Sequence, residues 1–195
     1  MSSVPNTYLT PQEYLAIERK AEYRSEYYRG EMFAMAGATW EHTLVKDNTA
    51  REMGNQLKDG PCRVLTSDLR VKVDATGLYT YPDIVVVCDK PIFEDDLFDT
   101  LKNPRALIEV LSDSTEDYDR GTKFKMYRQI PSLQEYVLIA QDQPLVERHV
   151  RQTNGDWLMT ELSDLSQTLE FASMPVKIAL AEVYRGVEFP EIEGR

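Results

Sequence analysis

Apolar positions along the chain follow helical spacing in some stretches and extended spacing in others, so helices and strands are predicted to interleave. A capping box at residues 10–13, with Pro11 in the first helical position, predicts the start of a helix. A second helix is predicted over residues 39–58, because Gly60 and Pro61 end the pattern there. Further helices are predicted over 117–129 and, near the end of the chain, over 176–184.

Extended runs between these helices predict the strands of a sheet. In one run Arg70 and Lys72 alternate with apolar residues, which predicts a half-buried strand whose basic side chains face outward. Other runs are almost wholly apolar, as is typical of strands covered on both faces. The chain is therefore assigned to the α/β or α+β class, with a central mixed β-sheet flanked by helices. The predicted strands cover residues 62–73, 81–88, 106–111 and 135–140, and the hairpins cover 25–35, turning near Arg29-Gly30, and 145–162, turning at Asn154-Gly155.

Length and composition predict a single domain over residues 1–195. No apolar run is long enough to span a membrane, and the first residues lack the apolar core of a secretory signal. We therefore expect a soluble cytoplasmic protein without a membrane partner. Cys62 and Cys88 both lie in apolar runs, where buried reduced thiols are expected.

The net charge of −11 argues against a polybasic protein that coats nucleic acid, since a field of this sign repels phosphate. The charge is distributed unevenly. Residues 40–72 and 102–130 each contain six basic and five acidic side chains, so the rest of the chain carries −13. A surface that binds DNA is therefore permitted near these two segments.

Two carboxylates lie in apolar strands: Asp83 opens one and Glu109 interrupts another. Burying a carboxylate is costly unless it is paired, protonated or bound to a cation. Each of the two alone is explained by a core Arg, a core Lys or a backbone donor. Together on neighbouring strands they favour a divalent cation, and oxygen ligands favour Mg²⁺ or Mn²⁺ over zinc.

A cation near these acids is predicted from the helix at 117–129. Asp119, Lys123 and Tyr127 are four residues apart and share one helical face, whereas Lys125 points elsewhere. Lys123 either forms an ordinary surface pair with Asp119 or reaches the metal-bound water or the scissile phosphate.

The order of these motifs resembles the Uma-type branch of putative restriction endonucleases, within the PD-(D/E)XK restriction-endonuclease-like superfamily. The resemblance covers about residues 8–187. It rests on LTPQEYL at 9–15, Glu26, Gly30-Glu31, Met35-Ala36-Gly37, Glu41-His42, YPDIVV at 81–86, EVLSDST at 109–115, YDRG at 118–121, Lys123, Tyr127-Arg128 and LQEY at 133–136.

The resemblance implies a restriction-endonuclease-like fold and Mg²⁺-dependent (or Mn²⁺-dependent) hydrolysis of DNA by a homodimer. It assigns Asp83 and Glu109 as metal-binding carboxylates and Glu26 as an additional catalytic and metal-binding acid. The superfamily's usual lysine position holds Leu111 here, so the resemblance transfers that role to Lys123, with Lys125 as the alternative.

Two other functions remain open from the sequence. One is a catalytically inactive module of the same fold that binds nucleic acid or protein, and the other is a metal-dependent phosphoesterase acting on nucleotides.

Further polar residues are candidates for a functional or a structural role. His42 either contacts substrate or is structural, and Asp68 either forms a turn or approaches the metal. His149 is expected on an exposed strand, Ser112 and Ser114 in a loop or cap, and the acidic residues 94–99 in solvent.

The charge distribution predicts that DNA binding is weak without divalent cation and strengthens when Mg²⁺ is supplied. The reason is that the cation neutralises the ligand carboxylates. Fluorescence anisotropy of labelled DNA in EDTA and in Mg²⁺, at matched ionic strength, measures this difference. Equal affinity in the two buffers would contradict the prediction.

Overall fold

The computed structural model describes residues 8–112 and 114–190, so Asp113 of the motif at 109–115 lies outside the described part. The helical elements are α1 (Pro11–Glu18), α2 (Trp40–Leu57), α3 (Glu116–Tyr118), the π-helical turn η1 (Asp119–Lys123), α4 (Phe124–Tyr127) and α5 (Leu180–Val183). The strands are β1 (Ser25–Tyr28), β2 (Glu31–Ala34), β3 (Arg63–Thr66), β4 (Arg70–Val73), β5 (Leu78–Thr80), β6 (Ile84–Val87), β7 (Thr100–Leu101), β8 (Ala106–Leu111), β9 (Glu135–Ala140), β10 (Val146–Arg151), β11 (Trp157–Leu162), β12 (Thr168–Glu170) and β13 (Lys177–Ala179).

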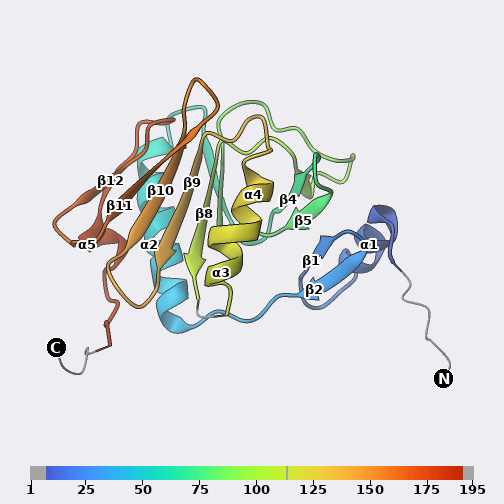
Figure 1. Cartoon of the computed structure of the whole chain (residues 1–195), viewed down its shortest axis with the longest axis horizontal. Helices are drawn as coiled ribbons and strands as arrows, with labels where there is room; N and C mark the ends of the chain where they lie inside the picture. The colour runs from blue at the N-terminus through green and yellow to red at the C-terminus, as the bar shows by residue number, and fades with distance from the viewer. Residues whose placement is uncertain (1–7, 113, 191–195) are drawn as a thin grey trace.

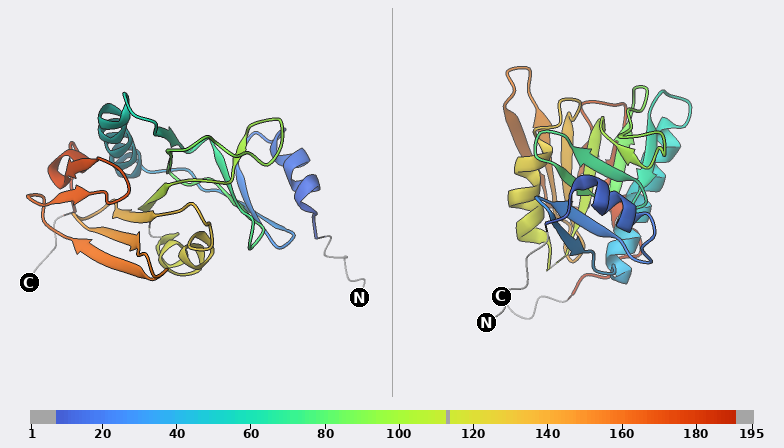
Figure 2. Two further views of the ribbon diagram at one scale, coloured as in Figure 1. Left: turned by 90° about the horizontal axis from the view of Figure 1, so that it is seen from above. Right: turned by 90° about the vertical axis from the view of Figure 1, so that its right-hand side faces the viewer.

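The strands form two main sheets joined along a seam. The smaller sheet has the order β2-β1-β5-β4-β7 and the larger the order β11-β10-β9-β8-β6-β3, while β12 and β13 pair separately. The chain passes between the two main sheets from β2 to β3 through α2, and again at β3–β4, β5–β6 and β7–β8. Figures 1 and 2 show the smaller sheet and α1 at one end of the molecule and β10–β11 toward the other. Side chains near these crossings can therefore come from both sheets.

The larger sheet is covered on both faces, as its apolar strands predict. Alternate residues of β8 enter different cores, with Ile108 on the α2 side and Leu107 on the side of α4. Met126 and Tyr127 of α4 pack into the second core, and Met53 of α2 packs into the first. Figure 1 shows α2 and the α3–α4 segment on opposite sides of β8 and β9. Glu109 is the single charged residue of β8 and lies between Ile108 and Val110, which both enter the core on the α2 side.

The first two predicted helices and both predicted hairpins are confirmed. The Thr10 capping box starts α1, and the N-cap Thr39 starts α2. Arg29 and Gly30 turn the first hairpin with positive φ angles of 49° and 92°, and Gly155 turns the second with a φ of 90°. Tyr14, Tyr27 and Tyr79 then join α1 to the smaller sheet through ring contacts.

The strand predicted over residues 62–73 is wrong in one respect, because the chain breaks it into β3 and β4 of different sheets. The break falls at Ser67, whose φ is +25°. Arg70 is buried instead of facing outward, since its guanidinium donates to the Tyr81 hydroxyl and the Thr100 hydroxyl. The alternation of apolar and basic residues within this run could not reveal that its second half belongs to another sheet.

Two predicted helices also differ from the structure. The helix at 117–129 contains a π-helical turn, η1, between α3 and α4. The segment predicted as helical over 176–184 begins as β13 and becomes helical only at α5. In that segment pairing with β12 overrides the local pattern.

The expectation of reduced thiols is wrong: Cys62 and Cys88 form a disulfide. The antiparallel β3–β6 register places Arg63 opposite Val87, so one step further along the ladder Cys62 opposes Cys88. This pairing depends on strand register, which the apolar character of the two runs does not determine.

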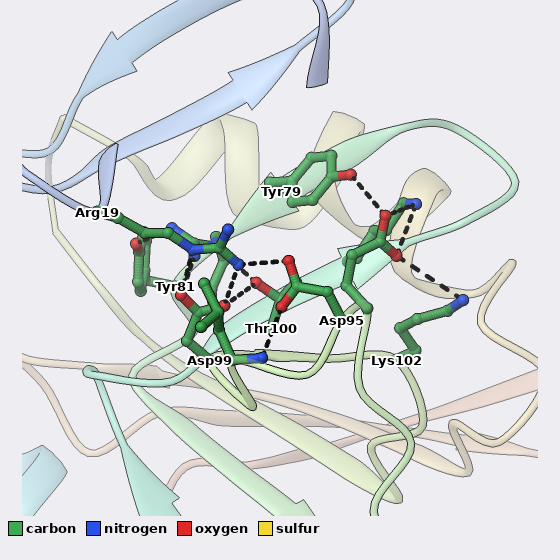
Figure 3. Close-up of polar contacts among 11 residues, drawn as sticks. Arg19, Tyr79, Tyr81, Asp95, Asp99, Thr100 and Lys102 are labelled. Carbon is green, nitrogen blue, oxygen red and sulfur yellow. Dashed lines mark hydrogen bonds and ion pairs between the residues drawn. The ribbon is translucent and has the colours of Figure 1, made fainter. Parts of the chain in front are cut away.

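The acidic segment 94–99 is not simply solvated, as the sequence suggested, but forms an ion-pair network with distant residues (Figure 3). Arg19, just after α1, binds Asp95 and Asp99 at 2.7 Å each, and Arg70 lies 3.0 Å from Asp99. The Arg19 guanidinium holds the pKa of Asp99 below its usual range. Lys72 binds Glu94 at 2.8 Å. The network fastens α1 to the smaller sheet.

Over the residues that the structure describes, no helix is long and apolar enough to cross a membrane.

Replacing Arg70 with Ala is expected to lower the free energy of unfolding by about 3 kcal/mol, because it leaves buried hydrogen-bonding groups and part of the Asp99 charge without a partner. Urea denaturation measures the change. Lys177→Ala is the matched control, since its pair with Glu170 is exposed and should cost less than about 0.5 kcal/mol. Similar losses in the two variants would contradict this role.

Candidate active site

A cleft of about 990 Å³ opens at the seam between the two sheets. Its wall includes the segment that joins β2 to α2, the first turn of α2 and the start of the α3–η1 segment. Glu26, Asp83, Glu109 and Lys123 all line it. The four residues that the family resemblance assigns to the site therefore share one cavity, although they come from four separate segments of the chain.

Asp83 and Glu109 lie beside each other because of strand register. The antiparallel β6–β8 pairing places Ile84 opposite Ile108, so Asp83 opposes Glu109 one position further. The Asp83 backbone N–H donates to Glu109 Oε2 at 3.2 Å, and the Val110 N–H donates to Asp83 Oδ2 at 2.9 Å. Pro82 lacks an N–H and ends the regular ladder before this pair. The two carboxylates thus lie where the paired strands meet the cleft.

His42 also belongs to this group. Its Nε2 atom lies 2.9 Å from Asp83 Oδ1, and its backbone N–H is capped by the Thr39 hydroxyl at the start of α2. The sequence left open whether His42 contacts substrate or is structural. In the structure His42 contacts the Asp83 carboxylate and fixes the position of one of its oxygens.

Lys123 is buried, with only 6% of its surface exposed, and is surrounded by three carboxylates. Its Nζ lies 3.0 Å from Glu109 Oε1, 3.2 Å from Asp119 Oδ1 and 3.3 Å from Glu26 Oε1. Lys125 is exposed on the opposite side of the segment. The ordinary surface pair considered from the sequence is therefore excluded: Lys123 reaches the cleft.

Hydroxyl groups hold the acids around Lys123. The Tyr127 hydroxyl donates to Glu109 Oε1 at 2.8 Å, the Thr80 hydroxyl donates to Glu26 Oε1, and the Tyr118 hydroxyl donates to Glu26 Oε2 at 3.3 Å. The β1–β5 register, in which Tyr27 opposes Tyr79, brings Thr80 opposite Glu26. The sequence did not reveal the role of these hydroxyls, although the four-residue spacing placed Tyr127 on the same helical face as Lys123.

Burial dominates the electrostatics of this group. It raises the pKa of Glu109 to about 8, and the negative charges of Asp119 and Asp83 add to the effect while Lys123 opposes it. Burial also raises the pKa of Asp119. Burial alone would lower the pKa of Lys123, but the neighbouring Glu109, Tyr127, Glu26 and Asp119 raise it well above its ordinary value. The ammonium therefore stays charged.

The acids at the cleft include oxygen donors of the kind that divalent cations prefer. Within residues 8–112 and 114–190, no three His, Cys, Asp or Glu side chains are arranged to hold a metal ion, so Glu26, Asp83 and Glu109 do not form a three-acid cluster. Mg²⁺ usually keeps several water ligands and is bound through one or two carboxylates plus substrate phosphate. Asp83 and Glu109, two adjacent carboxylates facing a cleft, fit that requirement.

The remaining polar residues lie in varied places. Asp68 pairs with Arg24 in the turn between β3 and β4, where the sequence suggested a turn. Ser112 and Ser114 hydrogen-bond each other in the loop before α3, as expected. His149 is not an exposed strand residue: it packs on Phe124 with ring centroids 4.5 Å apart, and burial lowers its pKa.

Comparison with known proteins identifies the family of the chain. The family model described as "Uma2: Putative restriction endonuclease" matches residues 11–181. The chain belongs to the Uma2 family. The resemblance inferred from the sequence motifs is thereby confirmed.

Two Synechocystis sp. proteins are similar to this Uma2 chain over most of its length. One, "Uncharacterized protein slr1290", is 35% identical over 96% of this chain and 97% of its own. The other, "Uncharacterized protein sll1609", is 36% identical over 86% of this chain and 95% of its own.

A crystal structure from Anabaena variabilis ATCC 29413, described as a putative nuclease belonging to DUF820, superposes on the Uma2 chain with a TM-score of 0.74. The match covers 90% of this chain and 97% of the other at 17% identity, so it bears on the fold. The restriction-endonuclease-like fold, with its mixed sheet flanked by helices, is confirmed.

Replacing Lys123 with Met is expected to lower the free energy of unfolding by about 2–4 kcal/mol, because three neighbouring carboxyls lose their shared cation. Lys125→Met removes the same charge from the exposed side of the segment and should change stability by less than about 0.5 kcal/mol. Thermal and urea unfolding of both variants measure the difference. Equal stability of the two would contradict the buried arrangement.

Proposed function

We propose that this Uma2 chain is a metal-dependent endonuclease that hydrolyses DNA phosphodiester bonds at the cleft. The observation that carries the proposal is the convergence of Asp83, Glu109 and Lys123 at the cleft, with the two carboxylates adjacent and the ammonium 3.0 Å from Glu109. Adjacent carboxylates beside a lysine match the chemistry of phosphoryl transfer, where charge on oxygen must be compensated.

Asp83 and Glu109 are the proposed ligands of Mg²⁺ or Mn²⁺. When bound there, the cation supplies positive charge that polarises the phosphate and makes a water molecule easier to deprotonate. His42 and the Val110 N–H hold the Asp83 carboxylate in a fixed orientation, which lowers the cost of arranging the ligands.

Lys123 is proposed to stabilise the negative charge that develops on the phosphate oxygens, or to orient the attacking water. Its ammonium has three N–H donors and lies beside three carboxylates, so one of them must be exchanged for a substrate oxygen. Glu26 and Asp119 then keep the lysine charged and positioned. A metal-binding role for Glu26 stays a prediction from the family resemblance.

The substitutions Asp83→Asn, Glu109→Gln and Lys123→Met are each expected to reduce cleavage of plasmid, linear duplex and single-stranded DNA at least about 100-fold in Mg²⁺ or Mn²⁺, because each removes a charged group from the reaction centre. Asp142→Asn and Lys125→Met are the matched controls and should retain activity, since neither lines the cleft. Gel assays and calorimetric titration with Mg²⁺ measure activity and metal binding separately.

The outcomes distinguish the alternatives. Cleavage that persists in Asp83→Asn or Glu109→Gln would refute this site. If the wild-type protein binds DNA but does not cut it in Mg²⁺ or in Mn²⁺, the result would indicate the inactive binding module. Turnover of mononucleotides without DNA cleavage would indicate the phosphoesterase. Light scattering tests the homodimer, which is proposed from the family resemblance.

A further inference from the structure

The outer wall of the cleft carries exposed aromatic side chains that the proposed hydrolysis does not use. Tyr23 and Phe33 line the cleft and are 69% and 48% exposed. Met35 lies beside them in the lining, and Trp40, which is 70% exposed, starts α2 next to the lining residue Thr39. A group of large apolar side chains left in water beside a functional cleft marks a binding surface.

The same cleft contains two basic side chains whose acidic partners are exposed. Arg24 lies over the Tyr81 ring and pairs with Asp68, whose side chain is 82% exposed. Lys46 donates to the Ser67 hydroxyl at 3.3 Å and lies 3.8 Å from the exposed Asp47. A pair with an exposed carboxylate contributes little to stability, so both cations can exchange that carboxylate for a phosphate. The first turn of α2, which lines the cleft at Thr39 and His42, adds the positive end of an 18-residue helix.

The reacting groups lie deep relative to this wall. The side chain of Glu109 is 5% exposed and that of Lys123 is 7% exposed, whereas Phe33 and Met35, which line the same cleft, are 48% and 38% exposed. A rigid duplex presents its phosphates on a wide convex surface and keeps its bases stacked inside. A flexible strand can bend into the cleft and turn its bases toward exposed rings.

We propose that the cleft binds an unpaired nucleic-acid strand, with bases stacked on Tyr23 and Phe33 and phosphates held by Arg24, Lys46 and the start of α2. This inference rests on the proposed nuclease function and names its substrate class. Stacking gives affinity without sequence preference, because every base has an aromatic face. The strand's backbone then lies over Asp83 and Glu109.

The test compares binding of three probes by fluorescence anisotropy: an oligothymidine, an oligouridine and a blunt DNA duplex, each about 20 nucleotides or base pairs long. Ca²⁺ replaces Mg²⁺ as an oxygen-binding divalent cation. The double variant Tyr23→Ala/Phe33→Ala removes both rings. Tyr23→Phe/Phe33→Tyr keeps them, and Phe98→Ala removes an aromatic ring that is 64% exposed outside the cleft.

Wild-type protein is expected to bind oligothymidine at least about tenfold more tightly than duplex. The double alanine variant should lose at least about tenfold in affinity for the strand and less than about twofold for duplex, while the ring-preserving variant and Phe98→Ala match wild type. Comparing oligothymidine with oligouridine identifies DNA or RNA as the source of the strand.

The proposal is overturned if duplex binds as tightly as the strand, if the alanine pair binds like wild type, or if neither oligonucleotide binds. Failure of the nuclease function is seen separately, as the absence of cleavage of the single strands and of duplex DNA in Mg²⁺ and Mn²⁺. Cleavage with unchanged strand binding in the alanine pair refutes stacking alone, and ring-dependent strand binding without cleavage refutes hydrolysis alone.

Discussion

The Lys123 ammonium and the Glu109 carboxylate are both removed from water, and much of the surrounding structure compensates for that cost. An isolated buried charge is penalised by several kcal/mol, so each ion requires partners. Lys123 finds three carboxylates at 3.0–3.3 Å, and Glu109 also accepts from Tyr127. These contacts come from the smaller sheet, from β8 and from the helical segment 116–127. Because η1 supplies both Asp119 and Lys123, the π-helical turn lies where such irregularities often accompany function.

The seam between the sheets determines which residues can meet. β5 ends in the smaller sheet and β6 begins in the larger one, so Asp83 lies at their junction. Glu26 reaches the same place from β1 through the Thr80 pairing, while the β6–β8 register supplies Glu109. Nothing local to one strand could assemble this group. The ion pairs of Arg19 and Arg70 with Asp99 hold the smaller sheet and α1 together, and thereby support the wall on which Glu26 lies.

The sequence predicted which side chains meet at the cleft better than it predicted the details of the fold, for physical reasons. Asp83 and Glu109 stand out because a carboxylate is rare among apolar strand residues, and their pairing follows once the strands are neighbours. Glu26 carries no such signal, since it lies in a short hairpin with polar neighbours, and only the family resemblance found it. Two expectations were wrong: that Arg70 faces outward, and that Cys62 and Cys88 are reduced. Both assumed a local environment that is in fact determined by distant segments of the chain. Asp99 likewise binds Arg19, 80 residues away in the sequence, which local composition cannot show.

The two oxygens of Glu109 face different partners, and this division links the proposed metal ligand Asp83 to the lysine. Oε1 lies toward Lys123 and the Tyr127 hydroxyl, whereas Oε2 accepts the backbone N–H of Asp83. Burial raises the pKa of this carboxyl to about 8, and the Lys123 ammonium 3.0 Å away opposes that rise. The divalent cation proposed for the Asp83 side would favour the ionised form in the same way, and would thereby strengthen the attraction of Oε1 for Lys123. In the proposed site, metal binding and positioning of the lysine would therefore support each other through the single side chain of Glu109.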